Sequence, residues 1–225
     1  MTPLTAKGVA VMPDALAVAR EADILLLAVK PAQVETVLAE VRPALDADTT
    51  LVSVAAGISL KKLENAVGGL CPVVRCMPNT PALVGKGVFA FCFNAASEQL
   101  EAKILRIFSA LGLCITLDEE RFSAFSALIG AGPAYVFAMM QGLVQAGVTL
   151  GFSHSDARRM VEALFAGAAA MAGGESAHLL QLRDAVCSPG GLTIAGVNHL
   201  DRAGLAGILV EAVLAADARG RAMEG

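Results

Sequence analysis

Residues 23–45 read "DILLLAVKPAQVETVLAEVRPAL", and two periodicities follow one another within this stretch. Residues 23–29 form a continuous apolar run that is typical of a buried strand, whereas apolar side chains recur at helical spacing after Pro31. A strand that leads directly into a helix is the repeating unit of a parallel sheet with helices on its faces. This stretch therefore predicts an α/β fold.

The same alternation continues up to about residue 120. Further strands are predicted over residues 49–57, 72–77, 87–93 and 113–117, and helices over residues 59–67 and 97–112. Beyond residue 120 the strands stop, and the patterns are helical over residues 122–152, 155–173, 178–186, 190–200 and 205–223. Ser153 and Ser155 are candidate caps for the second of these helices. We expect a doubly wound, mostly parallel sheet followed by an all-helical half.

Composition narrows the class of protein. The chain has 225 residues, of which 56% are hydrophobic, and its formal net charge is −4. Lys and Arg are scattered, and the aromatic residues are nine Phe, one Tyr and no Trp. A nucleic-acid surface needs a basic stripe, often with stacking rings, so we expect no nucleic-acid partner.

The five cysteines form no C-x-x-C pair, and the three histidines are isolated from one another. This spacing predicts no metal site. Buried free thiols in a reducing cytoplasm are favoured over disulfides. The N-terminal residues also lack the long apolar core of a signal peptide, so we expect a cytoplasmic protein.

One uncharged stretch, residues 122–153, is long enough to span a bilayer. Several glycines, two glutamines and Pro133 interrupt it, and no basic cluster flanks it. A helix that is apolar all round can instead be buried in protein. We therefore favour a packed core or subunit-interface helix over a membrane span, and expect no membrane partner.

In a parallel sheet, ligands bind at the carboxyl ends of the strands, which here are residues 28–31, 54–57 and 77–81. A nucleotide-binding sheet normally opens with a strand, a G-x-G-x-x-G turn and a helix, and this sequence contains no such turn. The residues alone thus predict a cytosolic α/β protein with a helical second half and a small-ligand site.

Three segments support a more specific prediction than composition and periodicity do. They are "LLLAVKP" (25–31) with "VSVAAGISL" (52–60), "RCMPNTPALVGKG" (75–87), and "LRDAVCSPGGLTIAGVNHLD" (182–201). Together they resemble the pyrroline-5-carboxylate reductase family, which reduces a cyclic imine to proline with a nicotinamide cofactor. The resemblance implies an incomplete Rossmann-like doubly wound sheet over residues 1–120. It also implies an all-helical dimerisation and substrate domain over residues 121–225, and hence a homodimer or larger homo-oligomer.

The resemblance also implies site residues. NADP or NAD, with NADPH preferred, would contact the strand ends at Ala28, Val29, Lys30, Pro31, Val54, Ala55, Ala56, Met77, Pro78, Asn79 and Thr80. The substrate would be held by Glu119, Ser188, Gly190, Gly191, Leu192 and Thr193.

The "CSPGG" turn has a physical rationale under this resemblance. A helix N-terminus attracts an anion such as the substrate carboxylate. Gly190 and Gly191 would let that carboxylate approach the backbone without a Cβ in the way. Thr193, assigned as the catalytic residue, would lie one turn into the helix, with its hydroxyl reaching the ring nitrogen. A protonated imine is already electrophilic, so no catalytic base is assigned.

Family members begin with a strand, the glycine turn, a helix and a second strand before the part that matches this sequence. We therefore expect residues 1–225 to bind nicotinamide cofactor weakly, to show little reductase activity and to leave one sheet edge bare. Two alternatives stay open. One is a non-catalytic helical dimerisation module of the same family. The other is a relative of the β-hydroxyacid dehydrogenases, which need a catalytic Lys and a different C-terminal signature.

Overall fold

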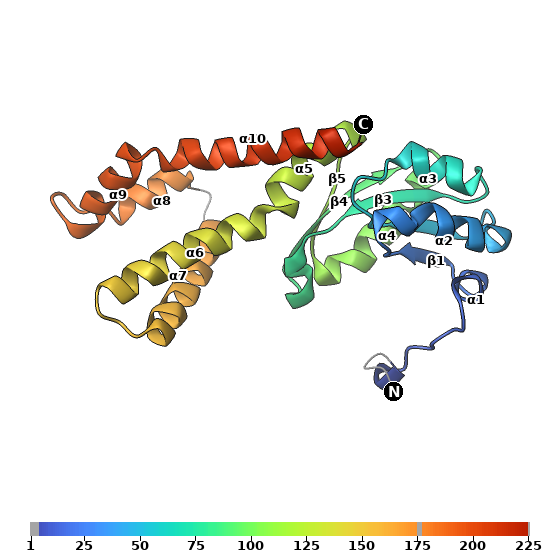
Figure 1. Ribbon diagram of the computed structural model, residues 1–225, viewed down its shortest axis with the longest axis horizontal. Coiled ribbons are helices and arrows are strands. Elements are labelled where there is room, and N and C mark those ends of the chain that lie inside the picture. The colour runs from blue at the N-terminus through green and yellow to red at the C-terminus, as the bar shows by residue number, and fades with distance from the viewer. Residues whose placement is uncertain (1–4, 175–176, 225) are drawn as a thin grey trace. The chain divides into compact units, whose positions relative to one another are not determined.

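The computed structural model describes residues 5–174 and 177–224, and the chain divides into two compact units (Figure 1). The first unit comprises Met1–Gly130 together with Asp217–Gly225 at the end of the chain. The second unit comprises Ala131–Ala216.

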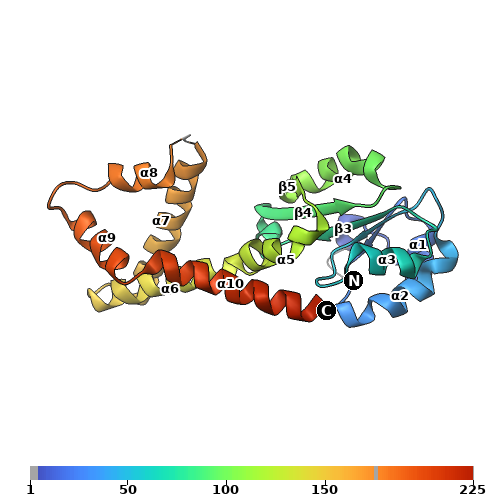
Figure 2. The ribbon, with the colours of Figure 1, turned by 90° about the horizontal axis from the view of Figure 1, so that it is seen from above.

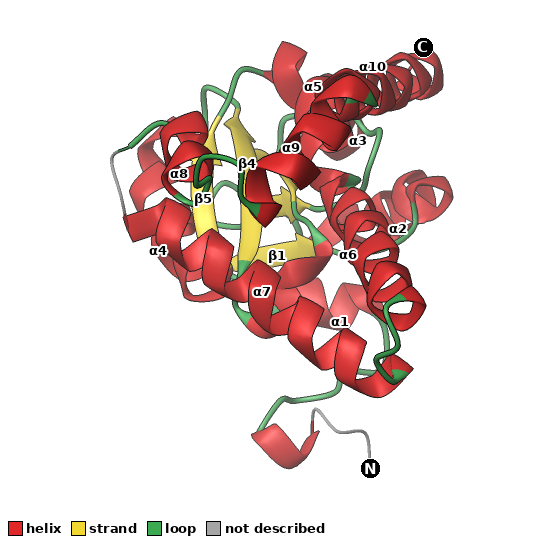
Figure 3. Ribbon diagram, turned by 90° about the vertical axis from the view of Figure 1, so that its left-hand side faces the viewer, coloured by secondary structure: helices red, strands yellow, loops and turns green. Residues whose placement is uncertain are grey.

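A five-stranded mixed sheet organises the first unit, with its strands in the order in which they occur in the chain (Figure 3). The strands are β1 (Ile24–Leu27), β2 (Thr50–Ser53), β3 (Val73–Met77), β4 (Gly87–Phe93) and β5 (Gly112–Thr116). β3 and β4 are antiparallel, and the other three neighbouring pairs are parallel. The α/β class with a mostly parallel sheet is therefore confirmed.

The predicted strands 23–29 and 49–57 are too long. β1 ends at Leu27 and β2 at Ser53, although the sequence stays apolar beyond both. Val54 N–H still donates to Leu27 O at 3.1 Å, and the chain then turns at Gly57, where φ is +72°. These residues leave the sheet at its carboxyl edge, so their apolar character does not reflect strand pairing.

Helices cover both faces of the sheet, as the doubly wound class requires (Figure 2). α2 (Val34–Val41) and α3 (Leu60–Val67) pack on one face, where Leu38, Leu51 and Leu63 are fully buried. α4 (Glu101–Phe108) packs on the other face through Ile104, against Phe91. The short helix α1 (Ala15–Arg20), which periodicity did not predict, joins the first of these cores through Ala19 and is capped by Asp14.

The stretch 122–152 was predicted as one helical run, and the structure divides it. α5 (Phe122–Phe125) leads into a π-helical segment, Ser126–Gly130, and α6 (Gly132–Thr149) follows with Pro133 in its first turn. Proline is tolerated there because the first helical amides need no intrahelical partner. Short π-helical segments are rare and are often found at functional sites.

The second unit is helical and has a small core of its own. After α6 come α7 (His154–Gly174), α8 (Leu179–Ala185), α9 (Leu192–Arg202) and α10 (Leu205–Glu224). Ser153 caps α7 by accepting from Asp156 N–H at 3.1 Å, whereas Ser155 lies inside the first turn. The buried apolar cluster of α6 and α7 consists of Val144, Ala157 and Val161.

Much apolar surface of the second unit is exposed, including Phe137, Leu150, Leu164, Leu192 and Leu214. By length and composition alone, the helical run Glu119–Thr149 could also cross a membrane, a test that core helices of soluble proteins pass as well. The favoured interpretation of residues 122–153 as an interface helix stays a prediction.

Candidate functional site

Because β1, β2 and β3 are parallel, their carboxyl ends meet at one edge of the sheet. The structure places all the predicted cofactor residues at this edge, in the three segments that follow these strands. These residues are Ala28, Val29, Lys30 and Pro31 after β1, Val54, Ala55 and Ala56 after β2, and Met77, Pro78, Asn79 and Thr80 at the end of β3.

The backbone at this edge is accessible to a ligand. Ala28 and Ala56 are exposed and carry only a methyl group. A Cβ added at Gly57 would meet no atom within 4 Å, so the turn after β2 borders open space. Small side chains at strand ends are what allows a ligand to approach the main chain closely. These residues could therefore hold one side of a nicotinamide cofactor.

The Asn79 side chain is held on both sides. Its Nδ2 donates to Ile129 O at 3.2 Å, and its Oδ1 accepts from Val88 N–H at 2.9 Å. A Cβ added at Gly130 would lie 3.1 Å from Met77 Cε, so the end of the π-helical segment packs on the end of β3. Periodicity could not reveal this contact between residues about fifty positions apart.

Glu119, predicted as a substrate contact, is also engaged within the first unit. Its Oε1 accepts from Arg75 Nη1 at 2.7 Å and from Leu60 N–H at 2.5 Å. The Arg75 guanidinium is buried and lies 4.5 Å from the centroid of the Phe122 ring. Sequence reasoning missed Arg75, although it is the only charged residue in the predicted strand 72–77. The role of Glu119 toward substrate stays a prediction.

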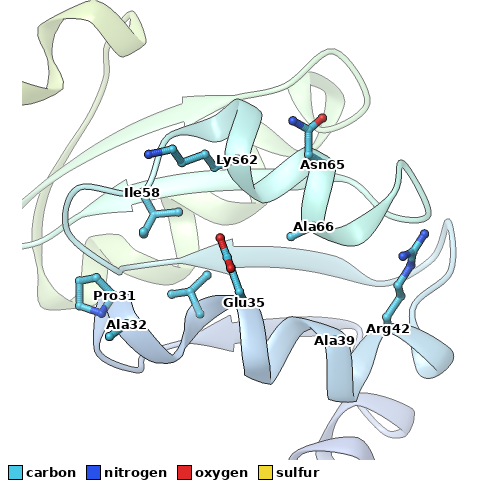
Figure 4. A pocket seen from close by; sticks show the side chains of 10 residues that line it. Pro31, Ala32, Glu35, Ala39, Arg42, Ile58, Lys62, Asn65 and Ala66 are labelled. Carbon is cyan, nitrogen blue, oxygen red and sulfur yellow. The ribbon is translucent and has the colours of Figure 1, made fainter. Parts of the chain in front are cut away.

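A cavity of about 280 Å³ borders this ion pair, between Gly57, Ser59, Lys62 and Arg221. Burial, followed by the nearby Glu119 carboxylate, raises the pKa of the Cys92 thiol. A larger cavity of about 820 Å³ lies between α2 and α3 (Figure 4). Of the predicted site residues only Pro31 lines this larger cavity, beside Glu35 and Lys62.

In the second unit, Ser188 to Gly191 form a tight turn. Gly191 N–H donates to Ser188 O at 3.0 Å, and Gly190 has a φ of +67°. Pro189 followed by a glycine with positive φ is typical of a type II turn. A Cβ added at Gly191 would overlap the Ser188 hydroxyl, so Gly190 is favoured by its positive φ and Gly191 by the close approach of Ser188.

This turn ends at the N-terminus of α9, with Gly191 as the N-cap. No described side chain caps α9, so the amides of its first turn are open to an anion. Leu192 is 96% exposed, and Thr193 is exposed as well. Thr193 is the second residue of α9 and lies in the first turn, so the expectation that it lies one turn in is wrong. Its hydroxyl and its amide therefore lie at the same helix end.

The predicted residues thus gather in two sets. The cofactor residues and Glu119 belong to the first unit, whereas Ser188, Gly190, Gly191, Leu192 and Thr193 belong to the second. The first set lies mainly at a sheet edge with small residues and the second at an open helix N-terminus, and their binding roles stay predictions.

Two family models match the chain. Residues 119–223 match the family described as pyrroline-5-carboxylate reductase dimerisation, and residues 3–57 match the one described as NADP oxidoreductase, coenzyme F420-dependent. With the doubly wound sheet and its ligand edge, these matches define an oxidoreductase that uses a nicotinamide dinucleotide.

Curated relatives and solved structures narrow this class. The chain is 37% identical to the pyrroline-5-carboxylate reductase of Pisum sativum over 95% of this chain and 78% of that protein. It is 38% identical to that of Pseudomonas aeruginosa over 88% of this chain and 74% of that protein. The chain belongs to the pyrroline-5-carboxylate reductase family.

Solved structures agree with this assignment. The enzyme from Coxiella burnetii superposes with a TM-score of 0.91 at 32% identity, covering 97% of this chain and 82% of that one. The Plasmodium falciparum enzyme, solved with NADP bound, superposes with a TM-score of 0.87 at 32% identity, covering 95% and 82%.

Proposed function

We propose that the protein reduces 1-pyrroline-5-carboxylate to L-proline with NADPH or NADH, as the last step of proline synthesis. The observation that carries this proposal is the Ser188–Gly191 turn at the uncapped N-terminus of α9. The family assignment supports it, since the chain is 37% identical to a curated relative over 95% of its length. NADPH is the favoured cofactor, because a relative of the same fold was solved with NADP bound.

The α9 N-terminus would hold the substrate carboxylate. The N–H groups of its first turn point out of the helix, and the helix dipole adds partial positive charge at this end. The open space at Gly190 lets an anion approach the main chain, since an added Cβ there would meet no atom within 4 Å. Binding of the carboxylate fixes the orientation of the ring, which is the main contribution that a protein makes to such a reaction.

Thr193 would hydrogen-bond the ring nitrogen through its hydroxyl, from the same helix end. The reduced nicotinamide, when bound, supplies the hydride that the imine carbon accepts. Ala28, Val54 to Ala56, Met77, Pro78 and Thr80 would border the cofactor at the sheet edge, whereas the Asn79 amide is bonded within the protein. A protonated imine needs no strong general acid, so Thr193 serves to orient and polarise the substrate.

We also propose a homodimer or larger homo-oligomer formed through the helical unit. A buried cluster of Val144, Ala157 and Val161 is too small to stabilise the second unit alone, and its exposed apolar residues match an interface. The match of residues 119–223 to a dimerisation family supports this. The five free cysteines support a reducing, cytoplasmic location.

The function is tested by mixing the protein with pyrroline-5-carboxylate and millimolar NADPH, and measuring both NADPH oxidation and L-proline. In keeping with the weak cofactor binding expected above, we expect slow turnover, with one proline formed for each NADPH oxidised and a still slower reaction with NADH. Titration with L-proline alone tests the α9 site independently of the cofactor. Proline binding without any reduction would favour the non-catalytic module, and neither binding nor reduction would refute the proposal.

A further inference from the structure

The Asn79 side chain joins three parts of the first unit. It follows β3, it accepts from Val88 N–H at the start of β4, and it donates to Ile129 O in the π-helical segment between α5 and α6. Both polar atoms of the amide are therefore used within the protein, at 2.9 and 3.2 Å. Because an amide donates and accepts with two separate atoms, one side chain serves both backbone groups.

Both partners are backbone groups, one at the start of β4 and one in the π-helical segment. In a π-helical segment the regular i to i−4 pattern is interrupted, so carbonyls near its end need other donors. The Asn79 amide supplies one to Ile129 O. Gly130, the next residue, packs on Met77, where a Cβ would lie 3.1 Å from Met77 Cε. Hydrogen bond and packing together hold the segment Ser126–Gly130 against the residues that follow β3.

We infer that Asn79 is a positioning residue for the reductase reaction. It fixes the segment Met77–Thr80 and the π-helical segment to one another, and it acts through them. This inference rests on the proposed function only for its kinetic consequence, because the proposed nicotinamide edge includes Met77. The two hydrogen bonds themselves are independent of any ligand.

The substitution Asn79→Asp tests the inference, because it is nearly isosteric and changes one bond. The new carboxyl keeps an acceptor for Val88 N–H, but when ionised it places a second lone pair opposite Ile129 O. When protonated, it donates again. We expect kcat to fall about 5- to 30-fold relative to the unsubstituted protein at neutral pH. The ratio of the variant's kcat to that of the unsubstituted protein should rise toward one as pH falls toward the pKa of the carboxyl.

Asn94 provides a matched control. Its Oδ1 accepts from Val73 N–H at 3.2 Å, and its Nδ2 donates to Glu64 Oε1 at 2.9 Å, at the opposite end of β3. Asn94→Asp should lower the unfolding midpoint without a pH-dependent change in the kcat ratio. Asn79→Ala removes both bonds and should lower kcat without recovery at low pH.

Two further measurements separate the possible outcomes. Hydrogen exchange of the amides of residues 126–131, measured without cofactor or substrate, should be faster in Asn79→Asp than in Asn94→Asp. This readout remains decisive even if the unsubstituted protein makes no proline, which would refute only the proposed function. The Kd for NADPH should change less than about twofold.

Three results would overturn the inference. The first is unchanged exchange at residues 126–131. The second is an Asn94→Asp protein with the same kcat loss and the same recovery at low pH, which would indicate a general stability effect. The third is an Asn79→Asp protein with a weakened NADPH affinity at unchanged kcat, which would make Asn79 a direct cofactor contact.

Discussion

Arg75 and Glu119 form an ion pair with 2.7 Å between Nη1 and Oε1, and the same carboxylate oxygen accepts the amide of Leu60 at the start of α3. Arg75 comes from β3, Leu60 follows the turn after β2, and Glu119 precedes α5. The two contacts therefore tie β3 and the start of α3 to the segment that precedes α5. The Arg75 side chain is 6% exposed and that of Glu119 is 32% exposed.

The first prediction concerns this pair. Glu119→Ala removes one charged acceptor of the buried Arg75 guanidinium and the acceptor of Leu60 N–H. We expect a loss of about 2 kcal/mol in the free energy of unfolding, since bonds to charged groups contribute about 1.5–3 kcal/mol and Glu119 is partly solvated. Urea unfolding measures this loss. Glu120→Ala, at the exposed neighbour, should change stability by less than about 0.5 kcal/mol. Equal losses in the two variants would show that the pair contributes nothing.

The second prediction concerns Thr193. Thr193→Val keeps the shape of the side chain and removes its hydroxyl. If the hydroxyl bonds the ring nitrogen in the transition state, kcat/KM for the imine should fall by about 5- to 150-fold, equivalent to about 1–3 kcal/mol. The Kd for NADPH should stay unchanged. Full kcat/KM in the variant would show that Thr193 is structural.

The third prediction concerns the glycine turn. Gly190→Ala forces a left-handed φ of +67° on a residue with a Cβ, which costs about 1–2 kcal/mol. The variant should be less stable and should bind L-proline more weakly. Gly196→Ala, in the middle of α9, meets no atom within 4 Å and should stabilise the helix by about 0.5–1 kcal/mol. Calorimetry with L-proline, together with thermal unfolding, compares the two. Equal proline affinity in Gly190→Ala would argue against the turn as the carboxylate site.

The fourth prediction concerns the oligomer. Phe137 on α6 is 64% exposed, so a glutamate there adds a charge to the proposed interface. Phe137→Glu should shift the protein toward monomer in light scattering. It should also lower the unfolding midpoint, because the exposed apolar residues of the helical unit would no longer be covered by a second copy of the chain. Leu70→Glu, at a 42% exposed position of the first unit, is the control and should leave the oligomer intact. A well-folded monomer of the unsubstituted protein at micromolar concentration would refute the proposed assembly.

The last prediction is a pH dependence. Near the end of α10, Arg221 Nε donates to Asp217 Oδ2 at 2.8 Å, and this hydrogen bond is the main cause that lowers the pKa of Asp217 from 3.8. Because the folded pKa is the lower one, the stabilisation is present above 3.8 and is lost as pH falls through the folded value. Asp217→Asn should therefore have a lower unfolding midpoint than the unsubstituted protein at neutral pH, and the two midpoints should converge in acid. A constant difference in unfolding midpoint down to the acid limit would contradict this.

Much of the fold follows from local pattern. The run 24–27 and the helical spacing of 34–41 are signals that neighbouring residues carry by themselves, so strand and helix could be placed within a few residues. The ends of the strands were predicted less accurately. The apolar residues after Leu27 and Ser53 read as strand, and the structure turns them toward the ligand edge, because pairing with the next strand stops there. The π-helical segment also escaped prediction, since its apolar pattern does not differ from that of a helix.

The sequence by itself determined the α/β order of elements, the family, and the Ser188–Gly191 turn, because each depends on residues that are close in the chain. Only the tertiary structure showed that Arg75 is buried against Phe122 and paired with Glu119, and that Asn79 bonds Ile129. These partners are separated by about fifty residues, and no spacing rule connects them. They meet because the antiparallel pairing brings the end of β3 beside the start of β4, where α5 and the π-helical segment pack. A buried polar group must also find a partner wherever the fold supplies one.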